Sequence, residues 1–143
     1  MIARYQKHIL EFKRPSGTSR GVLKTKETWF IILEKDGKKG FGECGILRSL
    51  SIDDVPEYEM KLQWVCEQIH LGLSTLLGEL IAFPSIQFGL EQAFLSLEQS
   101  NPFELFPSQF TDGADAIKIN GLVWMGDDQF MKSQIREKIE QGF

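Results

Sequence analysis

Five consecutive residues near the N-terminus carry the most suggestive chemistry in the chain. Ser16, Gly17, Thr18, Ser19 and Arg20 combine three hydroxyl donors with a guanidinium group. A guanidinium fork pairs with planar anions such as a carboxylate or a phosphate. An ordinary solvated loop is the alternative, and from these residues alone we favour it, because an anion site also needs converging backbone N–H groups.

A second stretch spells the glycine pattern of a dinucleotide site. Gly40, Gly42 and Gly45 match GxGxxG, in which glycines let the backbone approach a pyrophosphate where a helix begins. Here the glycines lie in and just after a predicted return strand, and no helix opens behind them. Close contact with another stretch of backbone in a turn is therefore the favoured interpretation.

The remaining titratable residues do not combine into a site. His8, His70, Cys44 and Cys66 lack the spacing of metal ligands, and the acidic residues between 53 and 59 suit the solvated first turn of a helix. No nucleophile, base and oxyanion partner occur together. We therefore predict no catalytic residue and no metal ligand in the chain.

The composition excludes several classes of protein. The 143 residues are 42% hydrophobic and 25% charged, as in ordinary globular domains. A net charge of −4 without a basic cluster argues against a nucleic-acid partner. Neither a signal-peptide core nor an apolar run of membrane-spanning length occurs. With both cysteines read as reduced, we expect a cytoplasmic protein with no membrane partner.

The elements that would position these residues begin with a three-stranded antiparallel meander. Apolar and β-branched residues predict strands over 2–13 and 27–35. Asp36-Gly37 predicts a type I′ turn into a return strand over 38–43. Between the first two strands, Pro, Gly and hydroxyl residues predict a mobile loop over 14–21.

Helical patterns follow the meander. Asp53 as N-cap and Pro56 predict an amphipathic helix that ends near Gly72. Two further helices are predicted over 74–82 and 86–99, the second started by Pro84-Ser85. A crossing loop over 102–113, whose aromatic side chains are expected to be buried, leads to the tail.

The tail predicts one strand and one helix. Residues 116–125 are mostly apolar, which is typical of a strand buried on both faces, and Asp127 and Gly142 predict the two ends of a helix. A parallel crossover needs a further strand, so we predict that the chain is an N-terminal fragment of a longer protein. Its fold class is α+β: a three-stranded antiparallel meander, a helical bundle, and the first strand and helix of a truncated (β/α) barrel.

Three stretches, taken in order, resemble the N-terminal half of the enolase superfamily. They are Lys39-Gly40-Phe41-Gly42-Glu43-Cys44-Gly45, then residues 84–97, then residues 119–143. Within the superfamily the chain resembles the muconate lactonizing branch, above all the o-succinylbenzoate synthase family. The resemblance implies a capping domain over 1–113 and the first β/α unit of the barrel over 114–143.

The resemblance also implies a function for the parent protein. Members are Mg²⁺-dependent lyases or isomerases in which a lysine removes a proton α to a carboxylate. In o-succinylbenzoate synthases the step is a dehydration in menaquinone biosynthesis. The paired lysines and the magnesium ligands would lie in barrel strands beyond Phe143, so Lys24-Thr25-Lys26, although it spells KxK, is not that motif.

In the family two loops of the cap close the barrel mouth and shape the substrate pocket. The first loop matches residues 16–21 here, and the second follows Gly42-Glu43 through Ile46, Leu47 and Arg48. A small carboxylate substrate would favour pairing with Arg20. The substrate-binding residues implied by the resemblance are Ser16, Gly17, Thr18, Ser19, Arg20, Ile46 and Leu47.

Alternatives remain within and outside the superfamily. A dipeptide epimerase or a muconate or chloromuconate cycloisomerase would have the same cap. A non-catalytic α+β interaction module would instead end naturally at Phe143. The expected partners are the missing C-terminal barrel and, through the unpaired edges of 116–125 and the apolar stripe of the last helix, a second copy of the chain, which makes a homo-oligomer.

Overall fold

The computed structural model describes residues 1–18 and 21–143, with the side chains of Ser16 and Thr18 excepted. These residues divide into two compact units. The first unit comprises residues 1–10 and 27–107, and the second comprises residues 11–26 and 108–143. No helix in the described part of the chain is long and apolar enough to cross a membrane.

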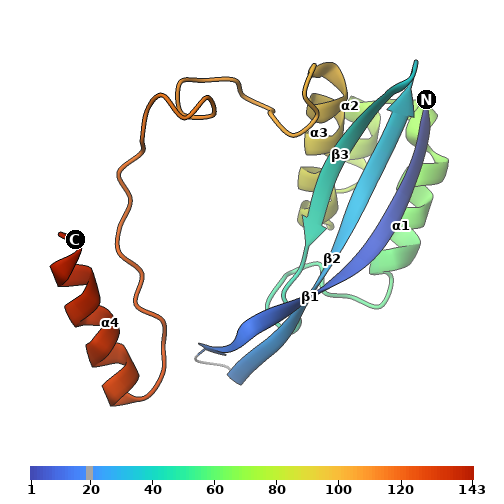
Figure 1. The fold of residues 1–143 in the computed structure, drawn as a ribbon. Helices are drawn as coiled ribbons and strands as arrows, with labels where there is room; N and C mark the ends of the chain where they lie inside the picture. The colour runs from blue at the N-terminus through green and yellow to red at the C-terminus, as the bar shows by residue number, and fades with distance from the viewer. Residues whose placement is uncertain (19–20) are drawn as a thin grey trace. The chain divides into compact units, whose positions relative to one another are not determined.

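One antiparallel sheet contains the three predicted strands in the order β1-β2-β3 (Figure 1). The strands are β1 (Ile2–Thr18), β2 (Gly21–Lys35) and β3 (Lys38–Gly45). Strands β2 and β3 pair from Lys35 with Lys38 to Thr28 with Gly45. Asp36 and Gly37 between them have φ angles of 50° and 77°, as a type I′ turn requires. The predicted meander and its hairpin turn are therefore confirmed.

The predicted mobile loop over 14–21 is wrong for most of its length. Strand β1 continues to Thr18 and β2 begins at Gly21. Pro15 fits within β1 because β1 is an edge strand, where a residue without an N–H group can face away from the ladder. Pairing between two long strands has overridden the local preference for a turn.

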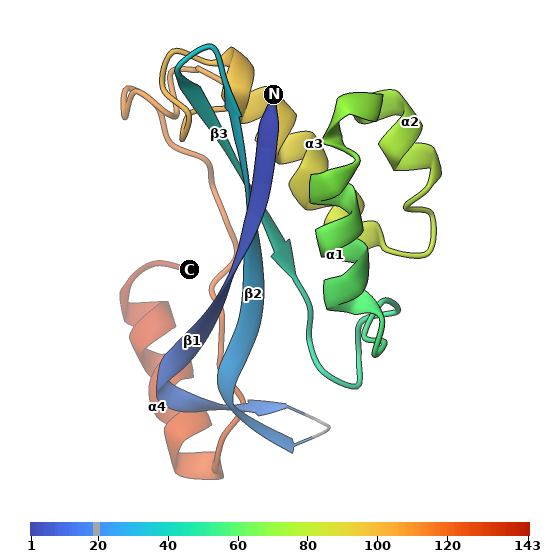
Figure 2. The same cartoon turned by 90° about the vertical axis from the view of Figure 1, so that its right-hand side faces the viewer.

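Helices cover one face of the sheet in the first unit, as Figure 2 shows. They are α1 (Tyr58–Glu67), the 3-10 turn η1 (Ile69–Leu71), α2 (Leu73–Gly78) and α3 (Pro84–Glu98). Helix α3 begins at the predicted proline. The helix predicted to reach Gly72 ends earlier, because the chain tightens from Gln68 into η1.

The hydrophobic core lies between the inward face of β2 and these helices. Trp29, Ile31 and Leu33 of β2 are all 0% exposed. They pack with Leu62 of α1 and Leu90 of α3, among others. Alternation along β2 and the three- and four-residue steps along α1 and α3 thus meet in one core.

Helix α3 lies directly against strand β3, and glycines permit the contact. A Cβ atom at Gly42 would overlap the backbone carbonyl of Gly89, and one at Gly40 would overlap that of Ala93. A Cβ atom at Gly89 would overlap the side-chain sulfur of Cys44. Two glycines of the GxGxxG pattern, Gly40 and Gly42, therefore serve close packing against backbone, although they lie within a strand and not in the expected turn.

The second unit contains α4 (Asp128–Glu140) with both predicted ends. The Asp127 carboxylate accepts a hydrogen bond of 2.8 Å from the Phe130 N–H. Gly142 has a φ angle of 84°, and the N–H groups of Gly142 and Phe143 bond to the carbonyls of Ile139 and Lys138. This is a Schellman ending, which satisfies the last carbonyls of the helix.

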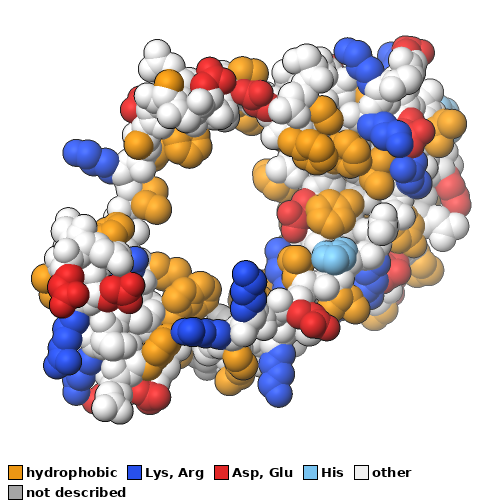
Figure 3. Space-filling view, in the orientation of Figure 1, with side chains coloured by type: hydrophobic (Ala, Val, Ile, Leu, Met, Phe, Trp, Pro, Cys, Tyr) orange, Lys and Arg blue, Asp and Glu red, His pale blue; other side chains and the backbone are white. Residues whose placement is uncertain are grey.

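Two expectations for the tail are wrong. Residues 116–125 form no strand, because none of the described strands pairs with them, and Ile119 is 76% exposed. The aromatic residues of 102–113 are not buried either, since Phe103 and Phe106 are 78% and 71% exposed. Phe103 stacks on Phe41 with 5.1 Å between ring centroids, which covers only one face of its ring. Hydrophobic side chains are visible on the surface of α4 and of the segment before it (Figure 3).

Candidate functional site

The structure describes the first predicted cap loop only in part. Ser19 and Arg20 lie outside the described residues, and for Ser16 and Thr18 only the backbone is described. Gly17 belongs to β1, and a Cβ atom there would lie 3.2 Å from the carbonyl oxygen of Met125. Substrate binding by these residues stays a prediction.

The second predicted loop, which follows Gly42-Glu43 through Ile46, Leu47 and Arg48, is part of a longer segment over 46–54 that is ordered by its own hydrogen bonds. We call this segment the 46–54 loop. The Leu47 N–H donates to Ser51 Oγ over 2.9 Å, and the Leu47 carbonyl accepts from the N–H groups of Leu50 and Ser51 at 3.1 and 2.9 Å. Ile46 is 2% exposed and belongs to the core. The apolar side chains that the loop presents to solvent are instead Leu50 and Ile52, which are 54% and 82% exposed.

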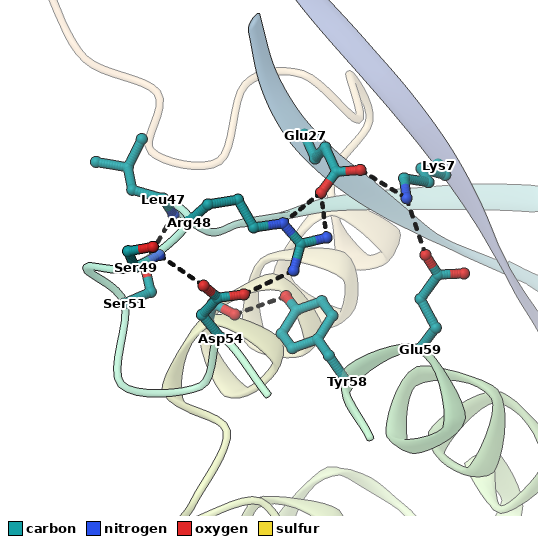
Figure 4. A network of polar contacts seen from close by, with 10 residues as sticks. Lys7, Glu27, Leu47, Arg48, Ser49, Ser51, Asp54, Tyr58 and Glu59 are labelled. Carbon is teal, nitrogen blue, oxygen red and sulfur yellow. Dashed lines mark hydrogen bonds and ion pairs between the residues drawn. The ribbon is translucent and has the colours of Figure 1, made fainter. Parts of the chain in front are cut away.

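A chain of alternating charges connects the 46–54 loop to the sheet and to α1 (Figure 4). Arg48 Nε donates to Glu27 Oε2 over 2.6 Å, and Arg48 Nη1 donates to Asp54 Oδ1 over 2.6 Å. Lys7 Nζ lies 2.8 Å from Glu27 Oε1 and 3.1 Å from Glu59 Oε1. Two cations thus join β1, β2, the loop and α1 through three carboxylates.

These contacts keep the groups charged at neutral pH. The hydrogen bond from Lys7 lowers the pKa of Glu27, with a further contribution from Arg48. The Ser49 N–H, followed by Arg48, lowers the pKa of Asp54. The bond to Asp54, followed by that to Glu27, raises the pKa of Arg48. Glu27 and Asp54 are therefore each paired with a cation and are not available as general bases.

A second polar cluster is buried at the end of the loop. Asp53 is 1% exposed, and its Oδ2 accepts from the Ser85 N–H at 2.9 Å and from the Ser85 hydroxyl at 2.6 Å. The Tyr58 hydroxyl lies 2.6 Å from Ser85 Oγ. The carboxylate thus satisfies the first turn of α3, where the helix dipole favours negative charge.

The structure therefore corrects the prediction that Asp53 is the N-cap of the first helix. Glu57 occupies the N-cap position of α1 and makes no side-chain capping bond. Glu59 does lie in the first turn of α1, as predicted for the acidic residues, and it also pairs with Lys7. The same prediction is wrong for Asp54, which precedes the helix and pairs with Arg48. Sequence reasoning missed these pairs because Lys7 lies on β1, far from Glu59 in sequence, and because the pairing of Arg48 with Asp54 depends on how the loop folds back on itself.

The described residues do not fit a Mg²⁺ site. No group of three His, Cys, Asp or Glu side chains within the described ranges is arranged to hold a metal ion. Burial raises the pKa of the Cys66 thiol to about 11 and that of Cys44 still further, so both thiols stay protonated and are poor nucleophiles. The ion pairs and hydrogen bonds around the 46–54 loop therefore supply no catalytic group, but they hold the loop in a defined shape.

Comparison with known proteins gives the arrangement its context. The o-succinylbenzoate synthase of Desulfotalea psychrophila (strain LSv54 / DSM 12343) is 33% identical over 170 aligned positions, which cover 97% of this chain and 46% of that protein. The crystal structure of MenC from Desulfotalea psychrophila LSv54 matches with a TM-score of 0.77 and 29% identity, over 100% of this chain and 47% of that one. The resemblance to o-succinylbenzoate synthases is confirmed. No protein-family model matches the chain.

More distant structures share the fold. An o-succinylbenzoate synthase from Thermosynechococcus elongatus BP-1, complexed with Mg in its active site, is 18% identical with a TM-score of 0.59, over 99% of this chain and 40% of that one. The L-Ala-D/L-Glu epimerase from Bacillus subtilis is 14% identical with a TM-score of 0.63, over 99% and 42%. The chain thus has the α+β cap fold of enolase-superfamily enzymes, and it spans about half the length of the relatives it matches.

Proposed function

We propose that this chain is the capping part of an o-succinylbenzoate synthase-like lyase whose catalytic barrel lies outside the 143 residues. One observation carries the proposal: 97% of the chain matches 46% of an o-succinylbenzoate synthase at 33% identity. This identity supports the synthase, whereas the dipeptide epimerase, at 14%, is similar in fold alone.

The reaction of the whole protein would be a Mg²⁺-assisted dehydration, begun by proton abstraction α to a carboxylate, in menaquinone biosynthesis. The lysine base and the metal ligands would belong to the barrel. The part left to this chain is to close the barrel mouth, to orient the carboxylate substrate and to exclude water.

The 46–54 loop is suited to that part. Its two ends are held in the interior by Ile46 and Asp53, which are 2% and 1% exposed. Between them the exposed side chains of Leu50 and Ile52 are apolar and would displace water from a substrate. Arg20, with its neighbours Ser16 to Ser19, would supply the anion contact.

A chimera tests the proposal. Residues 1–143 are joined to the part of the Desulfotalea psychrophila synthase that the chain does not match, and formation of o-succinylbenzoate is measured with added Mg²⁺. We expect the chimera to be active, and either half alone to be inactive.

The matched control carries the cap of the Bacillus subtilis epimerase in place of residues 1–143, and we expect it to lose the synthase reaction. A folded chimera of our chain that is inactive, or that epimerises dipeptides instead, would contradict the proposal. Reading the gene past codon 143 provides an independent check: an apolar strand with a KxK motif supports a barrel, whereas a stop codon supports the interaction module.

A further inference from the structure

The tip of the 46–54 loop has a backbone conformation that its own residues do not favour. Ser49 has a φ angle of 63°, in the left-handed region that side chains with a Cβ atom seldom adopt. Its N–H donates a hydrogen bond of 2.6 Å to Asp54 Oδ2. Such a conformation persists only where the surroundings hold it.

Arg48 supplies that hold from the neighbouring position. Its Nη1 donates to Asp54 Oδ1 at 2.6 Å, so the carboxylate that accepts from the Ser49 N–H is itself oriented by the guanidinium. Its Nε donates to Glu27 of β2, also at 2.6 Å. The guanidinium carbon lies 5.9 Å from the ring centroid of Trp29, which is 0% exposed. One side chain therefore ties the start of the loop, its end and the sheet together.

Glu27 is fixed from its other side as well. Lys7 Nζ lies 2.8 Å from the second oxygen of Glu27 and 3.1 Å from Glu59 of α1. It also lies 5.0 Å from the centroid of the Trp29 ring. Glu27, to which Arg48 binds, is thus fixed to the sheet and to α1, and the loop is held against that rigid framework.

The arrangement has a consequence for binding. Leu50 and Ile52 project from the tip at 54% and 82% exposure, on a backbone whose shape is already set. Ordering a loop at the moment of binding costs free energy, whereas a loop ordered beforehand spends that cost during folding. A flexible tip would weaken substrate binding, and a preset tip would strengthen it.

We propose that Arg48 is a positioning residue, which holds the tip of the 46–54 loop in its substrate-ready conformation through Glu27 and Asp54. The role of the loop at the substrate rests on the proposed function. The conformational hold does not, and it can be measured separately.

Hydrogen exchange on the 143-residue chain measures the hold. In Arg48→Met we expect the amides of Ser49 and Ser51 to exchange about ten-fold faster, since two ion pairs and an oriented acceptor are lost. Arg48→Lys keeps the charge but not the planar fork, so it should restore only part of the protection.

Arg4→Met is the matched control, because Arg4 is as exposed as Arg48, at 51% against 53%, and pairs with Glu34 of the same strand β2. It should leave both amides within two-fold of the parent chain. If Arg48→Met fails to fold, as judged by circular dichroism, Asp54→Asn removes the negative charge and one of the two acceptor oxygens with little change in volume, so the bonds from Arg48 and from the Ser49 N–H cannot both form. Unchanged exchange in a folded variant of either kind overturns the proposal.

The chimera supplies the functional readout. Arg48→Met is expected to raise KM for the substrate by about the factor seen in exchange, with kcat within two-fold, and Arg4→Met is expected to change neither. Faster exchange with an unchanged KM would show that Arg48 has only a structural role, and it would refute the proposal that Arg48 positions the loop for the substrate. An inactive parent chimera would instead sink the proposed function, while the exchange result would still decide whether Arg48 holds the tip.

Discussion

The substitution Gly42→Ala tests the closest contact between sheet and helix. Its Cβ atom would overlap the carbonyl of Gly89 and the amide nitrogen of Ala93. Both are backbone groups of α3, so relief requires the helix or the strand to move. Overpacking a close-fitting core costs about 1–3 kcal/mol, and a clash with backbone atoms places this variant near the top, at about 3 kcal/mol. At about 3–4 °C per kcal/mol for a chain of this length, Tm should fall by about 10 °C.

Urea unfolding followed by circular dichroism and tryptophan fluorescence measures the loss. Gly78→Ala is the matched control, since the same methyl group there has no atom within 4 Å and the site is an exposed helix end. Alanine is preferred to glycine in helices by about 0.5–1 kcal/mol, so the control should be neutral or slightly stabilised. Equal midpoints for the two variants would refute the inference that glycine permits the approach of α3 to β3.

Three further predictions concern the groups around the 46–54 loop. Asp53→Ala removes the acceptor of two hydrogen bonds at the start of α3 and should cost about 2–3 kcal/mol in urea unfolding, against about 1 kcal/mol for Tyr58→Phe, which removes one; equal losses would contradict this ranking. The pKa values of Glu27 and Asp54 are lowered in the folded chain, so their ion pairs stabilise fully above the unfolded values near ~4 and are lost as the pH falls through the lower folded values. Amide protection in the loop, corrected for intrinsic exchange, should therefore be constant from about pH 8 to 5 and decline below about 4, and a decline centred near neutral pH would point to other groups. Because the pKa of the half-buried Cys66 is raised to about 11 and Cys44 is buried, a thiol reagent at pH 7 should label the native chain far more slowly than the urea-unfolded chain, and equal rates would contradict the protection of the thiols.

Several elements of this fold could be predicted from the sequence because their signals act over a few residues. Asp36-Gly37 determines a turn through two positive φ angles, and Asp127 and Gly142 determine the ends of α4 through bonds within one turn. Apolar residues at every second position of a strand, or at three- and four-residue steps of a helix, marked the core-facing residues for the same reason, because each element has its own repeat. The enolase superfamily was indicated by a different kind of evidence, the resemblance of residues 39–45, 84–97 and 119–143 to its N-terminal half, and the comparisons confirm that resemblance.

The loop residues could be predicted only in part. The resemblance directed attention to Ile46 and Leu47, but it did not distinguish the residue that is buried from those that are exposed. Ile46 belongs to the core, and Leu50 and Ile52 form the exposed tip. Which way a loop side chain points depends on the elements beneath it, and the loop's own residues do not contain that information.

Tertiary structure alone decided the partners. Asp53 meets Ser85 and Arg48 meets Glu27 across 32 and 21 positions of sequence, and each pairing follows from how helix, loop and sheet are packed. The apolar run over 116–125 shows what happens when a partner is missing. Its composition suits a buried strand, yet it forms none, because none of the described strands pairs with it. A sequence pattern records which residues avoid water or favour a backbone conformation. Burial, strand pairing and ion pairing each need a second group, and only the folded chain determines which group that is.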